Sequence, residues 1–192
     1  MIETETREAV DHHKIILKVL ELLNSVSWAN LSLMTVAQEM KMRPLTLYKH
    51  FMTKGDLLTG IVRYMDEKTL ETYKESDPEV NPRDALFDIV MCRLEGLEPH
   101  KNAIRSLSYD LWQTPFNALE ACPSALNSFK WMLELAYIPT TGILGMIKLK
   151  AFAIVYGIII KTWLEDKEND LSKTMVVADK LLKKIEPVLR GF

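Results

Sequence analysis

Hydrophobic residues recur with a helical period along most of the chain. In residues 10–25, Ile15, Val19 and Leu23 follow one another at intervals of four and mark one face of a helix. Ile16, Leu20 and Leu22 widen this face into a broad apolar stripe, so the segment predicts an amphipathic helix with one buried side.

The next part of the chain predicts two short helices and one longer helix. Ser32 is suited to cap the first, because its hydroxyl can accept a hydrogen bond from a helix-starting N–H group. Pro44 can begin the second, over residues 44–50, since proline at the first helical position loses no intrahelical hydrogen bond. The longer helix is expected over residues 53–73, ahead of a break rich in proline and acidic residues.

Beyond that break the helical period continues to the end of the sequence. Helices are expected over residues 83–97, 100–113, 124–138, 143–164 and 171–189. No stretch alternates as a strand would, and no fixed repeat occurs. The sequence therefore predicts an all-α fold, divided at the long fourth helix into domains of residues 1–65 and 66–192.

Composition narrows the class of protein. Of 192 residues, 48% are hydrophobic and 26% charged, which excludes a disordered or fibrous chain. Cys92 and Cys122 are too few for a disulfide framework and lack metal-ligand spacing. The longest apolar run covers only residues 151–160 and is bracketed by lysines, and the polar N-terminus resembles no secretory signal. We expect a cytoplasmic protein without stable membrane insertion.

Charge is unevenly distributed, although the net formal charge is only −2. Residues 41–54 contain four basic residues, one histidine and no acid. Such a segment on an otherwise acidic molecule concentrates the attraction for an anion on one face. The alternative interpretation is a solvated helical face without a partner.

A motif spans this basic segment and extends beyond both of its ends. The residues are Leu33, Val36, Ala37 and Met40, then Pro44, Thr46, Leu47, Tyr48, His50 and Phe51, then Thr53, Lys54, Asp56 and Leu57. The run from Ile15 through Met65 resembles the N-terminal helix-turn-helix domain of TetR-family transcriptional repressors. The resemblance implies that the third helix enters the major groove of double-stranded DNA.

The resemblance also implies the DNA contacts. Tyr48, His50 and Lys54 would mainly bind phosphates, and Arg43, Leu45 and Thr46 would read bases. The full set of candidate DNA-binding residues is Ser32, Thr35, Arg43, Leu45, Thr46, Tyr48, Lys49, His50 and Lys54. Individually, Tyr48 could be a packed rim aromatic and His50 a helix terminator.

Three positions depart from the family pattern. Lys41 occupies the turn position where the family usually has glycine, so it is expected in a left-handed conformation at a cost of about 1 kcal/mol. Arg43 replaces the usual serine cap of the third helix and cannot cap it. Gly55 replaces a common acidic residue. These departures predict a DNA-binding unit less stable than usual.

In the TetR family the C-terminal part forms a homodimer through its last helices and binds a small effector. The predicted dimerisation residues are Phe152, Ile159, Trp163, Met175, Leu182 and Ile185. A two-fold dimer would place two recognition helices about one DNA turn apart, or a multiple of it. The alternative is that these helices only complete the core of a monomer.

Aromatic and methionine side chains of the central helices could line an apolar cavity. The candidate ligand-binding residues are Met91, Tyr109, Trp112, Phe116, Trp131, Met132 and Tyr156. They equally fit an ordinary core. Because few polar groups accompany them, the expected effector is small and hydrophobic, lipid-like or quinone-like.

The same residues leave two alternatives to a repressor. The C-terminal part also looks faintly like the TetR-like lipid-binding proteins of ubiquinone biosynthesis, which implies a lipid- or quinone-binding accessory protein without DNA binding. An enzyme is disfavoured, since the sequence has no phosphate-binding glycine loop, nucleophile elbow or paired metal-ligand histidines. No catalytic residue, cofactor or metal is predicted.

Overall fold

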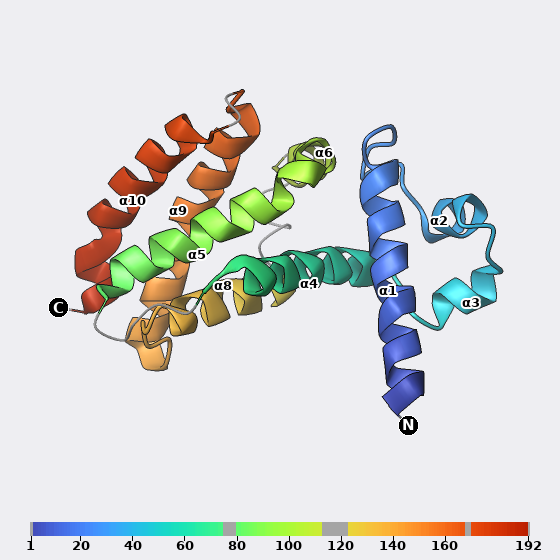
Figure 1. The fold of residues 1–192 in the computed structure, drawn as a ribbon, viewed down its shortest axis with the longest axis horizontal. Coiled ribbons are helices and arrows are strands. Elements are labelled where there is room, and N and C mark those ends of the chain that lie inside the picture. Colours follow the sequence, from blue (N-terminus) through green and yellow to red (C-terminus); the bar gives the residue numbers. More distant parts are fainter. Residues whose placement is uncertain (1, 75–79, 113–122, 168–169, 192) are drawn as a thin grey trace. The chain divides into compact units, whose positions relative to one another are not determined.

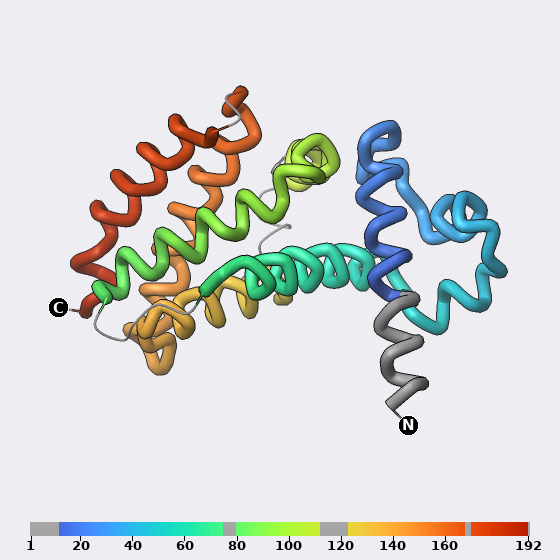
Figure 2. Tube along the Cα trace, viewed as in Figure 1, coloured from blue at the N-terminus to red at the C-terminus, as the bar shows by residue number. Residues whose placement is uncertain are grey.

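The computed structural model describes residues 2–74, 80–112, 123–167 and 170–191, with side chains from residue 12 onward. Within these ranges every regular element is helical and none is a strand, as predicted. The elements are α1 (Ile2–Leu22), α2 (Leu33–Glu39), α3 (Pro44–Tyr48), α4 (Lys54–Thr72), α5 (Pro82–Leu97), η1 (Glu98–His100), α6 (Lys101–Trp112), α8 (Pro123–Leu135), α9 (Gly142–Glu165) and α10 (Ser172–Arg190). Figure 1 labels them on the ribbon, and Figure 2 traces the same path.

The chain divides into two compact units. Unit 1 contains Met1–Tyr64 and Pro99–Ser124, and unit 2 contains Met65–Glu98 and Ala125–Phe192. The boundary between residues 64 and 65 falls beside the predicted division at 65. The segment after residue 98, however, groups with the N-terminal unit, because α6 packs against α1.

Unit 1 is built around α1, which contacts both α2 and α6. Ile15, Val19 and Leu23 are buried on the predicted face of this helix. Gly60 allows α4 to approach it closely, since a Cβ there would lie 2.5 Å from Cδ1 of Ile16. The first helix therefore holds the short helices α2 and α3 in place.

Unit 2 contains α5, α8, α9 and α10. The helices α9 and α10 lie side by side, and α10 also packs against α5 (Figure 1). Phe152, Ile159, Trp163 and Leu182 are fully buried between these helices. Their apolar side chains form the core of this unit.

Candidate nucleic-acid interface

The helix α2 begins as the sequence predicted. Oγ of Ser32 accepts a hydrogen bond from the backbone N–H of Thr35 at 3.1 Å, and the two side-chain hydroxyl oxygens lie 2.9 Å apart. Ser32 is exposed and Thr35 half-buried. Ser32 therefore caps the helix, as predicted, and its hydroxyl stays on the surface of unit 1.

The turn between α2 and α3 has the strained residue that the motif predicted. Lys41 has a φ of +53°, in the left-handed region. Its N–H donates to the carbonyl of Gln38, and the N–H of Met42 donates to that of Ala37, each at 3.0 Å. This pair of bonds is the Schellman arrangement, which normally has glycine at the left-handed position.

Replacing Lys41 by glycine is therefore expected to stabilise the protein. Lys41→Gly should raise the free energy of unfolding by about 0.5–1 kcal/mol, because glycine adopts positive φ without steric cost. Urea denaturation followed by circular dichroism measures the change. The control is Met40→Gly, at a φ of −81°, which should destabilise instead. Equal destabilisation by both variants would contradict the assigned strain.

The helix α3 is shorter than predicted and ends at Tyr48 rather than at residue 50. It begins with Pro44 after Arg43, whose side chain makes no capping hydrogen bond, as expected. Leu47 is fully buried and Phe51 nearly so, and these two residues anchor the helix to unit 1. The opposite face points to solvent.

That exposed face carries most of the predicted base- and phosphate-contacting residues. Leu45 is 72% exposed and Tyr48 42% exposed, and Thr46 is half-buried beside them. An apolar side chain exposed to this degree at the tip of a short helix has no packing role within unit 1. It is suited to contact with the methyl group of a thymine.

Three cations surround this face. Lys41, Arg43 and Lys49 are all exposed, and none forms an ion pair within the part of the chain that the structure describes. No acidic residue lies between Lys41 and Lys54 in the sequence. The surface around α3 is therefore positively charged and without internal compensation, which favours binding of a polyanion.

His50 has a more structural position than predicted. Its ring lies edge-on to the ring of His12, with 4.7 Å between centroids, and His12 in turn lies 5.2 Å from the ring of Phe51. His50 is half-buried in this contact with α1. His12 was not among the predicted site residues, since it precedes the motif and only the folded chain brings it to α3.

Lys54 does not point away from unit 1 as a phosphate ligand would. Its ammonium donates to the backbone carbonyls of Trp28 and Ala29 and lies 4.7 Å from the centroid of the Trp28 ring. Burial lowers the pKa of Lys54, and the charge of Asp110 partly offsets this. The predicted phosphate contact is therefore replaced by a contact that holds the loop between α1 and α2.

The start of α4 is closed by a reciprocal capping box. The N–H of Thr53 donates to Oδ2 of Asp56 at 2.8 Å, and the N–H of Asp56 donates to Oγ1 of Thr53 at 3.1 Å. Hydrogen bonds from the Thr53 backbone and hydroxyl lower the pKa of Asp56. The Asp56 carboxylate thus occupies the N-terminus of α4. A phosphate therefore has less access to this helix end than the sequence motif indicates.

The predicted effector-binding residues do not gather at one place. Met91, Met132 and Tyr156 are buried in unit 2, with Trp131 half-buried beside them, whereas Tyr109 belongs to unit 1 and is 64% exposed. Phe116 and the side chain of Trp112 lie outside the described residues. The exposure of Tyr109 removes it from the apolar lining, because α6 turns this position to solvent.

A buried polar cluster occupies the position where an apolar cavity was predicted. Arg93 is 2% exposed, and its Nη1 donates to Oδ1 of Asp66 at 2.6 Å and contacts Sδ of Met132 at 3.6 Å. Oγ of Ser128 donates to the same Asp66 oxygen at 2.5 Å. Burial raises the pKa of Tyr156, and the neighbouring Arg93 charge opposes that rise. The sequence showed no sign of this pairing, since Asp66 and Arg93 come from different helices.

Four of the predicted dimerisation residues are buried within the single chain. Phe152, Ile159, Trp163 and Leu182 are 0% exposed in the single chain, so they belong to its own core and cannot meet a partner. Met175 is exposed and Ile185 half-buried, and these two stay compatible with the prediction. This burial was not predicted because α9 is apolar around most of its circumference, so its sequence does not distinguish the core face from the outer one.

A different face of α9 carries the exposed apolar residues. Besides Leu144 and Met146, they include four isoleucines on one side, Ile143, Ile147, Ile154 and Ile158. At 100° per residue these positions span an arc of about 60° on the helix. Gly157 lies beside them, and a Cβ there would meet nothing within 4 Å. We call these four isoleucines the α9 stripe.

The helix α9 is also the one described helix long and apolar enough to cross a membrane by length and composition. The helix has 24 residues, and the test window has a mean hydropathy of 2.1, with a third of it buried inside the protein. Three lysines interrupt the helix, at positions 148, 150 and 161. A charged side chain at the centre of a bilayer costs about 3 kcal/mol or more, so these lysines disfavour a spanning orientation.

Two solved structures share the fold. A TetR transcriptional regulator from Nitrosomonas europaea ATCC 19718 matches with a TM-score of 0.69 at 14% identity, covering 90% of this chain and 96% of that one. A TetR transcriptional regulator from Rhodococcus sp. RHA1 matches with a TM-score of 0.62 at 18% identity, covering 90% and 97%. No family model and no curated protein matches the sequence. The predicted TetR-like all-α fold is thereby confirmed.

Proposed function

We propose that this chain is a TetR-type transcriptional regulator, a repressor that binds palindromic operator DNA as a homodimer. The observation that carries the proposal is the outer face of α3, where Leu45 and Tyr48 are exposed among the uncompensated cations Lys41, Arg43 and Lys49. Regulators with this fold are its structural neighbours. An exposed apolar residue surrounded by cations is suited to the major groove of DNA, where the apolar side chain can contact base edges and the cations can contact the flanking phosphates.

Within this proposal the contacts divide by chemistry. Arg43, Leu45 and Thr46 read base edges, and Tyr48 and Lys49 bind phosphates. Ser32 and Thr35 can approach a neighbouring phosphate from the start of α2. Lys54 and His50 hold the helices in position, since their side chains are already engaged with the α1–α2 loop and with His12.

The DNA proposal is tested by the salt dependence of binding. With a pool of random 30-base-pair duplexes (about three helical turns), affinity should fall steeply as salt rises, because phosphate contacts release counterions. Lys49→Met should weaken binding to all duplexes. It should also reduce the slope of log affinity against log salt concentration by about one per subunit. Fluorescence anisotropy at several salt concentrations measures both quantities.

One control keeps the charge at position 49, and the other removes a lysine charge elsewhere. Lys49→Arg should keep the slope of the unmodified protein, and Lys130→Met, on α8 of unit 2, should leave affinity and slope unchanged. A slope that is the same with and without Lys49 would contradict a phosphate contact. Absence of binding to every duplex at low ionic strength would overturn the whole proposal.

The α9 stripe supports the dimer. Four exposed isoleucines on one narrow face lose contact with water when two copies pair through α9. Met175 and Val176 are further exposed apolar residues, on the neighbouring helix α10. Two-fold pairing gives each dimer two copies of α3, as recognition of a palindrome requires.

Release by a small hydrophobic effector is a further part of the proposal. Its support is the aromatic cluster of unit 2, where the ring centroids of Phe129 and Tyr156 lie 4.9 Å apart and those of Phe152 and Tyr156 lie 5.9 Å apart. Met91 and Met132 are buried in the same unit. Flexible methionine and aromatic side chains can repack around an apolar guest.

A lipid- or quinone-binding accessory protein is the second candidate. The apolar surface of α9 is the observation that favours it. The cations around α3 favour the regulator, since a lipid carrier has no use for them there. Mass spectrometry of organic extracts from the purified protein separates the two: a stoichiometric lipid in material that binds no duplex supports the accessory protein.

A further inference from the structure

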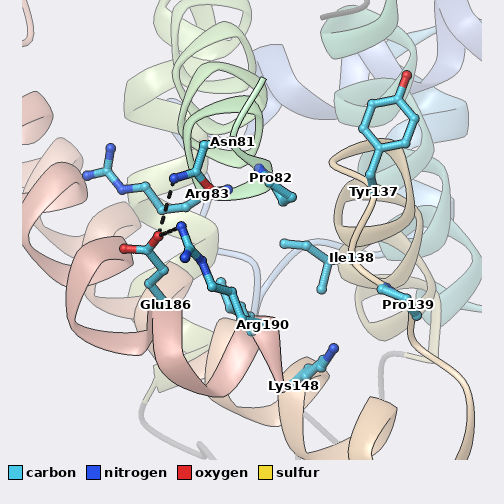
Figure 3. Close-up of a pocket in the computed structure, with 10 residues that line it drawn as sticks. Asn81, Pro82, Arg83, Tyr137, Ile138, Pro139, Lys148, Glu186 and Arg190 are labelled. Atoms are coloured by element: carbon cyan, nitrogen blue, oxygen red, sulfur yellow. Dashed lines mark hydrogen bonds and ion pairs between the residues drawn. The ribbon is translucent and has the colours of Figure 1, made fainter. Parts of the chain in front are cut away.

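A pocket of about 220 Å³ lies in unit 2, and none of its lining residues belongs to the predicted DNA-binding residues or to the α9 stripe. Its walls come from the start of α5, the loop between α8 and α9, and the last turns of α10 (Figure 3). Pro82, Ile138, Pro139 and Leu189 make these walls largely apolar. None of the predicted effector-binding residues lines it.

Lys148 is the unusual residue of this pocket. It is only 5% exposed, and no hydrogen bond or ion pair joins its ammonium to any residue that the structure describes. In Figure 3 its amine points toward the side of the pocket where Ile138 and Pro139 lie. The stem of Lys148 is buried, whereas its ammonium keeps contact with the open space of the pocket and has no counter-charge among the described residues, so an anion in the pocket would pair with it directly.

The other charged groups of the pocket are already engaged. Glu186 accepts from Asn81 Nδ2 at 3.3 Å and pairs with Arg190 Nη2 at 2.6 Å, as the dashed lines in Figure 3 show. Arg83 is bound to Asp84 and Asp179. The unmatched charge is therefore the single one of Lys148, and the carboxylate of Glu186 disfavours a dianion.

We propose that this pocket binds a small organic monoanion, a carboxylate on a short apolar body, with the carboxylate on Lys148 and the body against Ile138, Pro139 and Leu189. The volume equals that of about seven water molecules, which suits an acid of roughly that number of non-hydrogen atoms. This site is separate from the proposed operator surface and does not depend on it.

Benzoate and its neutral analogue benzamide test the proposal on the full-length protein. Isothermal titration calorimetry should give a dissociation constant below about 1 mM for benzoate and binding more than about tenfold weaker for benzamide, which lacks the charge. In methyl-labelled protein, the Ile138 δ1 resonance, assigned with Ile138→Val, should shift on benzoate addition.

Two variants complete the test. Lys148→Met keeps the length of the side chain but removes its charge, and it should weaken benzoate binding more than about tenfold while leaving the weak benzamide binding unchanged. Lys173→Met, an exposed lysine at the other end of α10, should bind benzoate as the unmodified protein does. The proposal fails if benzamide binds as tightly as benzoate, if Lys148→Met has no effect, or if benzoate does not bind. The first and third results need no variant, so they stand even where Lys148→Met does not fold.

Discussion

Ile154→Glu is expected to convert a dimer into a monomer. Ile154 is 68% exposed in the middle of the α9 stripe, and two-fold symmetry would introduce the charge twice into the same interface. Burying two unpaired carboxylates should weaken the dimer by at least about 100-fold. Sedimentation equilibrium at micromolar concentration measures the dissociation constant of the dimer.

The same substitution should abolish tight operator binding while leaving the fold intact. Each monomer would keep one α3 helix and lose the second half-site contact, whereas Ile154 makes no contribution to the buried core of its own chain. The control is Leu70→Glu, an equally apolar and exposed position on α4. A dimer that persists in Ile154→Glu, or dissociates equally in Leu70→Glu, would assign the interface elsewhere.

Asp66→Ala should destabilise unit 2 by about 3–5 kcal/mol, because it leaves the buried guanidinium of Arg93 without its carboxylate partner. The ion pair is short, at 2.6 Å, and Ser128 loses its acceptor as well. Nε of Arg93 already has no hydrogen-bond partner in the structure, so the site tolerates no further loss. Urea denaturation followed by tryptophan fluorescence gives the free energy of unfolding.

Two further variants show whether the loss of stability is specific to the buried pair or follows from any lost ion pair on α4. Glu71→Ala breaks the exposed pair with Lys68 on the same helix and should cost less than about 1 kcal/mol. The double substitution Asp66→Leu with Arg93→Met removes both charges and should recover most of the lost stability. If Asp66→Ala costs no more than Glu71→Ala, the buried pair does not stabilise the fold.

Much of the DNA-binding unit followed from local chemistry. The spacing of Leu47 and Phe51 predicted the buried face of α3, and the position of Lys41 predicted its left-handed backbone. Ser32 and Pro44 predicted two helix starts. These features involve residues a few positions apart, so the order of residue types determines them.

The contacts that Lys54 and His50 make within unit 1 could not be predicted from local sequence. Lys54 meets carbonyls of Trp28 and Ala29, and His50 meets the ring of His12. These partners lie more than twenty residues away along the chain. A side chain that is suited to both phosphate and carbonyl contacts is directed to one of them only by the packing of α1 on the short helices.

The amino-acid sequence by itself determined that the chain is helical, where most helices begin, and that positive charge gathers around α3, since these depend on period, capping and residue type. Tertiary structure alone decided which side of α9 is buried, because that helix is apolar on nearly every side and only its packing against α10 and against Phe129 of α8 selects the core face. The same holds for the Arg93–Asp66 pair and for Lys148, whose burial results from contacts between helices distant in the sequence.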